Sequence, residues 1–246
     1  TCLTLDPNNA EVYKNKGTTL EGLGRDEDAL FAYKQAEALN PNDAEIAHYQ
    51  CTVLTNLGQL SEALGACNKA LSIKSAFPEA HYSRGNIFSE LGQHENAELE
   101  YATATSLDPS FAKAYKKHGD ALLNLKRDAK ALQSFEKACA LGLETPQLYT
   151  NRAAVLNNLK RFDDSLMSAE RAIKLDPTYS PAWTNHGVAL KHLDRFDDAL
   201  KSLRTAAEIK PKDADCHYNL GTVFEAMGDI DAALDSYNRA ISLRSD

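Results

Sequence analysis

A period of 34 residues constrains this chain more than any other feature. The stretch 10–43 holds two amphipathic helical patterns, in which residues four and seven apart share one helix face. Gly24 ends the first pattern and Asn40-Pro41 ends the second, because Gly accepts a left-handed cap and Pro cannot continue a helix. The unit recurs without insertion or deletion. The seven repeats are 10–43, 44–77, 78–111, 112–145, 146–179, 180–213 and 214–246, and residues 1–9 are expected to be the tail of a preceding repeat.

Small residues recur at three positions, counted from the first residue of each repeat. Position 8 holds Gly17, Cys51, Gly85, Gly119, Ala153, Gly187 and Gly221. Position 20 holds Ala29, Ala63, Ala97, Ala131, Ser165, Ala199 and Ala233, and position 27 is Ala in every repeat. Small side chains let two helix backbones approach closely. The pattern therefore predicts an all-α chain of antiparallel helix pairs, each stacked on the next.

Aromatic, small, Leu, Ala, aromatic, Ala and Pro residues at these fixed positions resemble the tetratricopeptide repeat family. The resemblance covers residues 10–246 and implies a right-handed α-solenoid. It also implies a protein that binds other proteins. We therefore expect no enzymatic activity and no cofactor.

The charge balance bears on the kind of partner. With 27 basic and 35 acidic residues, the formal net charge is −8, which argues against a nucleic-acid partner. The chain contains no apolar run long enough to cross a bilayer, so we expect no membrane insertion.

The five cysteines are Cys2, Cys51, Cys67, Cys139 and Cys216. No two have the CxxC spacing, and each stands where the repeat needs a small or apolar residue. We therefore expect buried reduced thiols in a cytoplasmic protein, with the nucleus as an alternative; zinc binding or a disulfide is less favoured. The histidines contain no HxxxH pair and no nucleophile motif is present, so no metal site or catalytic site is expected.

The family resemblance places position 6 of each repeat along a concave groove. Asn occupies it in Asn15, Asn151, Asn185 and Asn219, of which the last three belong to consecutive repeats. An Asn amide can pair with the C=O and N–H groups of a bound peptide without reading its side chains. This resembles the asparagine ladder of O-linked N-acetylglucosamine transferases. The alternative is that Asn simply suits a solvated position.

A basic cluster and several apolar residues share that surface. Lys113, Lys116 and Lys117 lie on one helix face, where they could hold a carboxylate or an acidic peptide. Alternatively they pair with Asp120 or with neighbouring acids, and no complete carboxylate clamp of the co-chaperone type can be assembled around them. Aromatic or apolar anchors are offered by Tyr82, Leu123, Val188 and Tyr218, unless these pack against the adjacent repeat.

Together these features predict a protein-interaction scaffold that binds a peptide segment or a helix of a partner in the concave groove. Two alternatives stay open. Because the chain begins with Thr and ends without a polar closing helix, it could be the targeting arm of a larger enzyme such as a glycosyltransferase. It could also self-assemble through exposed ends of the array.

Overall fold

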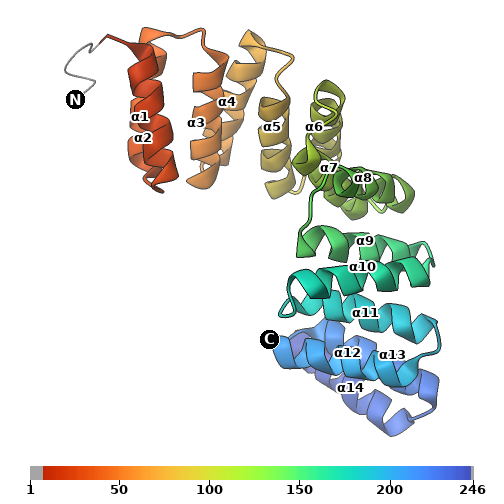
Figure 1. Cartoon of the computed structure of the whole chain (residues 1–246). Helices are drawn as coiled ribbons and strands as arrows, with labels where there is room; N and C mark the ends of the chain where they lie inside the picture. The colour runs from red at the N-terminus through yellow and green to blue at the C-terminus, as the bar shows by residue number, and fades with distance from the viewer. Residues whose placement is uncertain (1–7, 245–246) are drawn as a thin grey trace. The chain divides into compact units, whose positions relative to one another are not determined.

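The computed structural model describes residues 8–244, and this part of the chain forms fourteen α-helices and no strand (Figure 1). The first seven helices are α1 (Ala10–Gly22), α2 (Asp26–Leu39), α3 (Ala44–Asn56), α4 (Leu60–Ile73), α5 (Pro78–Glu90), α6 (His94–Leu107) and α7 (Ala112–Asn124). The others are α8 (Asp128–Ala140), α9 (Pro146–Asn158), α10 (Phe162–Leu175), α11 (Ser180–His192), α12 (Phe196–Ile209), α13 (Ala214–Met227) and α14 (Ile230–Arg244). The tail expected at residues 1–9 falls largely on residues 1–7, which lie outside the described residues.

The chain packs as two compact units, one up to Ala121 and one from Leu122 onward. From α1 to α6, and again from α8 to α14, each helix packs against the next helix along the chain. The pairs α1–α2 and α3–α4 show this arrangement in the earlier unit, and α11–α12 and α13–α14 show it in the later one (Figure 1). The all-α fold of stacked helix pairs is confirmed.

Helix starts follow from local sequence. Thr145 caps α9 by accepting a hydrogen bond from the backbone N–H of Leu148 at 3.2 Å, and Pro146 follows in the first turn. Pro78 likewise stands in the first turn of α5. Asp43 caps α3 by accepting from the backbone N–H of Glu45 at 2.8 Å. Local sequence therefore accounts for the starts of α3, α5 and α9.

The small residues lie where two helices of one repeat touch. Alanines at position 27 are buried in every repeat, and so are the residues at positions 8 and 20. Gly85 shows why: a Cβ atom there would fall 2.7 Å from the Tyr101 ring. Where position 8 is glycine, a large side chain at position 24 fills the space it leaves open, as Tyr33, Tyr101, Leu203 and Tyr237 do.

One pair of cysteines contradicts the expectation of five reduced thiols. Cys51 of α3 and Cys67 of α4 are joined by a disulfide, with their Cα atoms 5.3 Å apart. They occupy positions 8 and 24, which face each other across the helix pair, so spacing along the sequence did not reveal their proximity. Cys139 is half-buried and Cys216 is buried, both as free thiols. Cys2, the fifth cysteine of that expectation, lies outside the described residues.

No helix in residues 8–244 is both long enough and apolar enough to span a membrane.

Candidate functional site

Three of the predicted asparagines lie on neighbouring first helices of the later unit. Asn151, Asn185 and Asn219 belong to α9, α11 and α13, and α11 contacts both of the other helices. The side-chain amide of Asn185 donates to the main-chain oxygen of Thr150 at 3.3 Å, which joins α11 to α9. In return, the Asn157 amide donates to the main-chain oxygen of Asn185 at 3.3 Å. These amides therefore tie first helices together and stand at the surface they form.

Beneath this surface, α9 contains buried polar atoms without a hydrogen-bond partner in the described part of the chain. Thr150 is only 3 % exposed, and neither its hydroxyl nor the Oδ1 atom of Asn157 has a hydrogen-bond partner within the described residues. Both belong to α9, as does Asn151, which is half-buried. A buried polar atom that stays unpaired costs free energy, so this stretch of α9 retains hydrogen-bonding capacity.

The other two asparagines differ in their surroundings. Asn219 is half-buried, and its main-chain oxygen accepts from the Thr222 hydroxyl at 2.9 Å. That hydroxyl also lies 3.5 Å from the Lys191 ammonium of α11. Asn15 is exposed on α1, in the other compact unit.

The lysine cluster on α7 is already partly paired. The ammonium of Lys116 lies 2.7 Å from Asp120 one turn along the helix, as the alternative interpretation proposed. Lys113 is exposed and Lys117 is half-buried. The charge of Lys116 is therefore already paired within its own helix.

Tyr82 packs inside the earlier unit instead of projecting from it. Its ring centroid lies 5.0 Å from that of Phe111 and 5.9 Å from that of Tyr101. Burial raises the pKa of its phenol. Packing therefore accounts for this aromatic residue. Leu123 and Val188 are half-buried.

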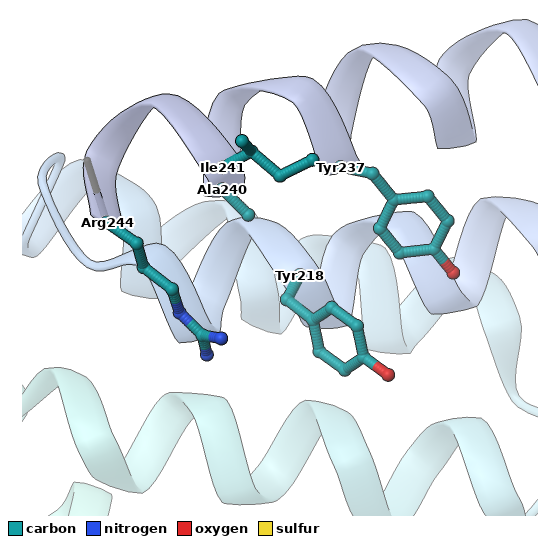
Figure 2. Close-up of a pocket in the computed structure, with 5 residues that line it drawn as sticks. All are labelled: Tyr218, Tyr237, Ala240, Ile241 and Arg244. Carbon is teal, nitrogen blue, oxygen red and sulfur yellow. The ribbon is translucent and has the colours of Figure 1, made fainter.

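Tyr218 is 52 % exposed and lines a hollow of about 410 Å³ beside α14 (Figure 2). The other lining residues are Tyr237, Ala240, Ile241 and Arg244. The Tyr237 hydroxyl donates to Glu225 at 2.5 Å, and this hydrogen bond raises the pKa of Tyr237 to about 12. Repeat one has the same pair, since Tyr33 donates to Glu21 at 2.8 Å.

The two tyrosines differ in what covers them. Tyr33 is fully buried because the Tyr49 ring of the next repeat stacks on it at 5.4 Å. Tyr237 keeps part of its ring exposed at the hollow. The hollow therefore has apolar walls and one charged rim residue, Arg244.

A second hollow, of about 220 Å³, lies between α3 and α5 and was not singled out from the sequence. It is lined by Glu45, His48, Tyr49, Phe77 and Glu79. An imidazole nitrogen of His48 lies 3.0 Å from the Ser83 hydroxyl, and burial lowers the pKa of His48, so the ring is neutral at pH 7. The signal that could have found this hollow is a Glu at position 2 of three consecutive repeats, namely Glu11, Glu45 and Glu79.

Lys14 lies between the first two of these glutamates. Its ammonium is 2.8 Å from Glu11 and 3.1 Å from Glu45, with Asp43 at 3.8 Å. The hydrogen bond to Glu11, with help from Glu45 and Asp43, raises the pKa of Lys14. Lys14 is therefore a cation held by acids from two repeats.

Within residues 8–244 no three His, Cys, Asp or Glu side chains gather as a metal site would require.

These features define a helical-repeat protein with a polar face built by its first helices. Models of the tetratricopeptide repeat match residues 10–43, 82–147, 146–179 and 178–246, and the chain belongs to the tetratricopeptide repeat family. No curated protein matches its sequence.

Solved structures share the fold. YrrB, described as a TPR protein with an unusual peptide-binding site, is 27% identical, with a TM-score of 0.61 over 74% of this chain and 93% of its own. Pseudomonas aeruginosa PilF is 18% identical, with a TM-score of 0.75 over 84% of this chain and 94% of its own. The Cut9–Hcn1 assembly of the APC/C is 20% identical, with a TM-score of 0.70 over 99% of this chain and 48% of the matched chain. The fold is that of a protein-interaction scaffold.

Proposed function

We propose that the chain binds an extended segment or a single helix of a partner protein along the face formed by α9, α11 and α13. The observation that carries this proposal is the repetition of Asn151, Asn185 and Asn219 at one position on three neighbouring helices. An extended peptide offers C=O and N–H groups at regular intervals. A row of amides at a regular interval suits that pattern.

The hydrogen bonding of this face supports the same proposal. The Asn185 amide is held by its bond to Thr150, so its orientation is set before a ligand arrives. Polar groups held by packed helices lose little entropy on binding, which favours affinity.

The proposal is tested by affinity capture from a cell lysate, with bound proteins identified by mass spectrometry. The test variant is Asn151→Ala/Asn185→Ala/Asn219→Ala. The matched control, Gln133→Ala/Arg204→Ala/Asn238→Ala, changes three exposed residues of second helices in the same unit.

We expect the asparagine variant to lose partners that wild type and control both retain, while circular dichroism shows all three folded. A partner lost only from Lys113→Ala/Lys117→Ala would move the binding site to α7. If the folded asparagine variant keeps every partner, binding along this face is ruled out.

A further inference from the structure

The glutamates at position 2 form a series along the first helices of the earlier unit. Glu11, Glu45 and Glu79 begin α1, α3 and α5, and α3 contacts both of the other helices. The series therefore has two steps, one between Glu11 and Glu45 and one between Glu45 and Glu79. Each step brings two carboxylates from successive repeats to one side of the unit.

A lysine of the chain itself lies between the first two glutamates, Glu11 and Glu45. Lys14, at position 5 of repeat one, places its ammonium within 3.1 Å of both glutamates. Only 13% of its side chain is exposed, so the ammonium is largely removed from water. Partial burial strengthens its attraction to the two carboxylates. The Lys14 ammonium thus shows that a cation can bind between two glutamates at position 2 of successive repeats.

The second step lacks that cation. Position 5 of repeat two is His48, whose ring lies 3.0 Å from the Ser83 hydroxyl and also hydrogen-bonds the backbone of Glu79. Burial lowers the pKa of His48 although the charges of Glu79 and Glu45 oppose that shift, so no permanent cation stands here. The hollow of about 220 Å³ lies at this step, with Glu45 and Glu79 among its lining residues. Within the described residues Glu79 takes part in no ion pair, whereas Glu45 is shared with Lys14.

The walls of the hollow suit the hydrocarbon part of a long basic side chain. Tyr49 and Phe77 contribute aromatic surface, and lysine side chains pack their methylene groups on such surface while the charged end reaches polar groups. The aromatic ring of Phe77 already attracts one cation, since the Lys74 ammonium lies 4.5 Å from its centroid. Lys74 forms no ion pair with Glu45 or Glu79 in residues 8–244.

We propose that the hollow between α3 and α5 binds a lysine side chain of the partner protein, with its ammonium between Glu45 and Glu79 as Lys14 is between Glu11 and Glu45. This rests on the proposed function, because it specifies the chemistry of a partner of the same scaffold. The proposed lysine-binding site belongs to the earlier unit, whereas the face with Asn151, Asn185 and Asn219 belongs to the later unit.

The test is an NMR titration of the full chain with acetyl-glycyl-lysyl-glycine amide. The matched probe carries norleucine, which keeps the methylene stem and lacks the ammonium. We expect shift changes at His48, Tyr49 and Glu79 with the lysine peptide, and a dissociation constant on the order of 1 mM. The norleucine peptide should bind at least fivefold more weakly. An arginine probe distinguishes a site for lysine from one for any cation.

Three variants sharpen the test. Glu79→Gln should weaken lysine binding about five- to tenfold, while Glu62→Gln, an exposed residue of α4, should leave it unchanged. His48→Lys copies repeat one and should fill the hollow from within, so the peptide should no longer shift Tyr49. Because Glu79 is exposed, Glu79→Gln keeps the test valid even if His48→Lys folds poorly.

Equal binding of the lysine and norleucine peptides, or unchanged binding by Glu79→Gln, would overturn the proposal. These readouts do not depend on any cellular partner. Failure here therefore leaves the asparagine face untouched, and failure of the lysate capture leaves the lysine site standing.

Discussion

Gly17 lies against the ring of Tyr33 so closely that a Cβ atom at residue 17 would fall 2.3 Å from the Cε1 atom of Tyr33. The two residues belong to α1 and α2 of one repeat and stand at positions 8 and 24. Repeat six has the same relationship between Gly187 and Leu203, at 2.6 Å from Cγ. The crossing of the two helices in a repeat therefore depends on a matched pair of side chains.

This pair predicts opposite effects for two glycine substitutions. Gly17→Ala should destabilise the earlier unit by about 1–3 kcal/mol, because the methyl group has no room beside the buried Tyr33 ring. Gly65→Ala should stabilise it by about 0.5–1 kcal/mol, since α4 is helical there and the space is open. Urea unfolding monitored by circular dichroism measures both. Equal midpoints for the two variants would show that the ring moves aside at little cost.

The Cys51–Cys67 disulfide predicts that reduction weakens the earlier unit. The two cysteines are 16 residues apart, and a bond closing a loop of that size stabilises by about 3 kcal/mol in the chain-entropy account. Calorimetry with and without a reductant should show a lower melting temperature after reduction. Cys139→Ala, which leaves the bond intact, should respond to the reductant as wild type does. Labelling of both thiols by a maleimide in the unreduced, unfolded chain would contradict the bond.

A backbone conformation at the end of α9 predicts a stabilising substitution. Lys160 has φ of 59°, in the left-handed region, at the position where Gly24 and Gly92 have φ of 70° and 71°. A non-glycine residue pays a steric penalty there, so Lys160→Gly should stabilise the later unit by about 0.5–1 kcal/mol. The urea midpoint measures the change. A lower midpoint for the variant would mean that the lysine side chain contributes more than its strained backbone costs.

Buried imidazoles predict that stability falls in mild acid. Burial lowers the pKa of His48 and His186, so the folded chain releases these protons more readily than the unfolded chain, whose histidines titrate near 6.5. Below about pH 6.5 the unfolded state binds more protons, and the free energy of unfolding drops as pH falls toward the folded-state pKa values. Unfolding midpoints at pH 7.5 and 5.0 test this. His186→Gln should show a smaller drop than wild type, whereas the surface variant Arg204→Gln should show the same drop.

The repeat boundaries and the buried small positions were predictable because each depends on residues within one repeat. Every first helix begins at the first residue of its 34-residue range, as α3 does at Ala44 and α5 at Pro78. The disulfide and the hollow beside Glu79 were not predicted, because both depend on which side chains meet across helices. The partner of Lys116 was among the predicted alternatives, since Asp120 lies on the same helix. Local periodicity therefore defines the scaffold, and only packing reveals which polar groups are already occupied.

The matched pairs at positions 8 and 24 have a consequence for how such a chain can change. Repeat one uses Gly and Tyr, repeat two two bonded cysteines, repeat five two alanines, and repeat six Gly and Leu. Each combination fills the space between the two helices of its own repeat, and the residue at position 24 also contacts the next repeat, as Tyr33 does with Tyr49. Different side-chain combinations therefore support the same packing of the two helices in different repeats. The exposed residues can therefore differ from one repeat to the next while the packing between helices is maintained.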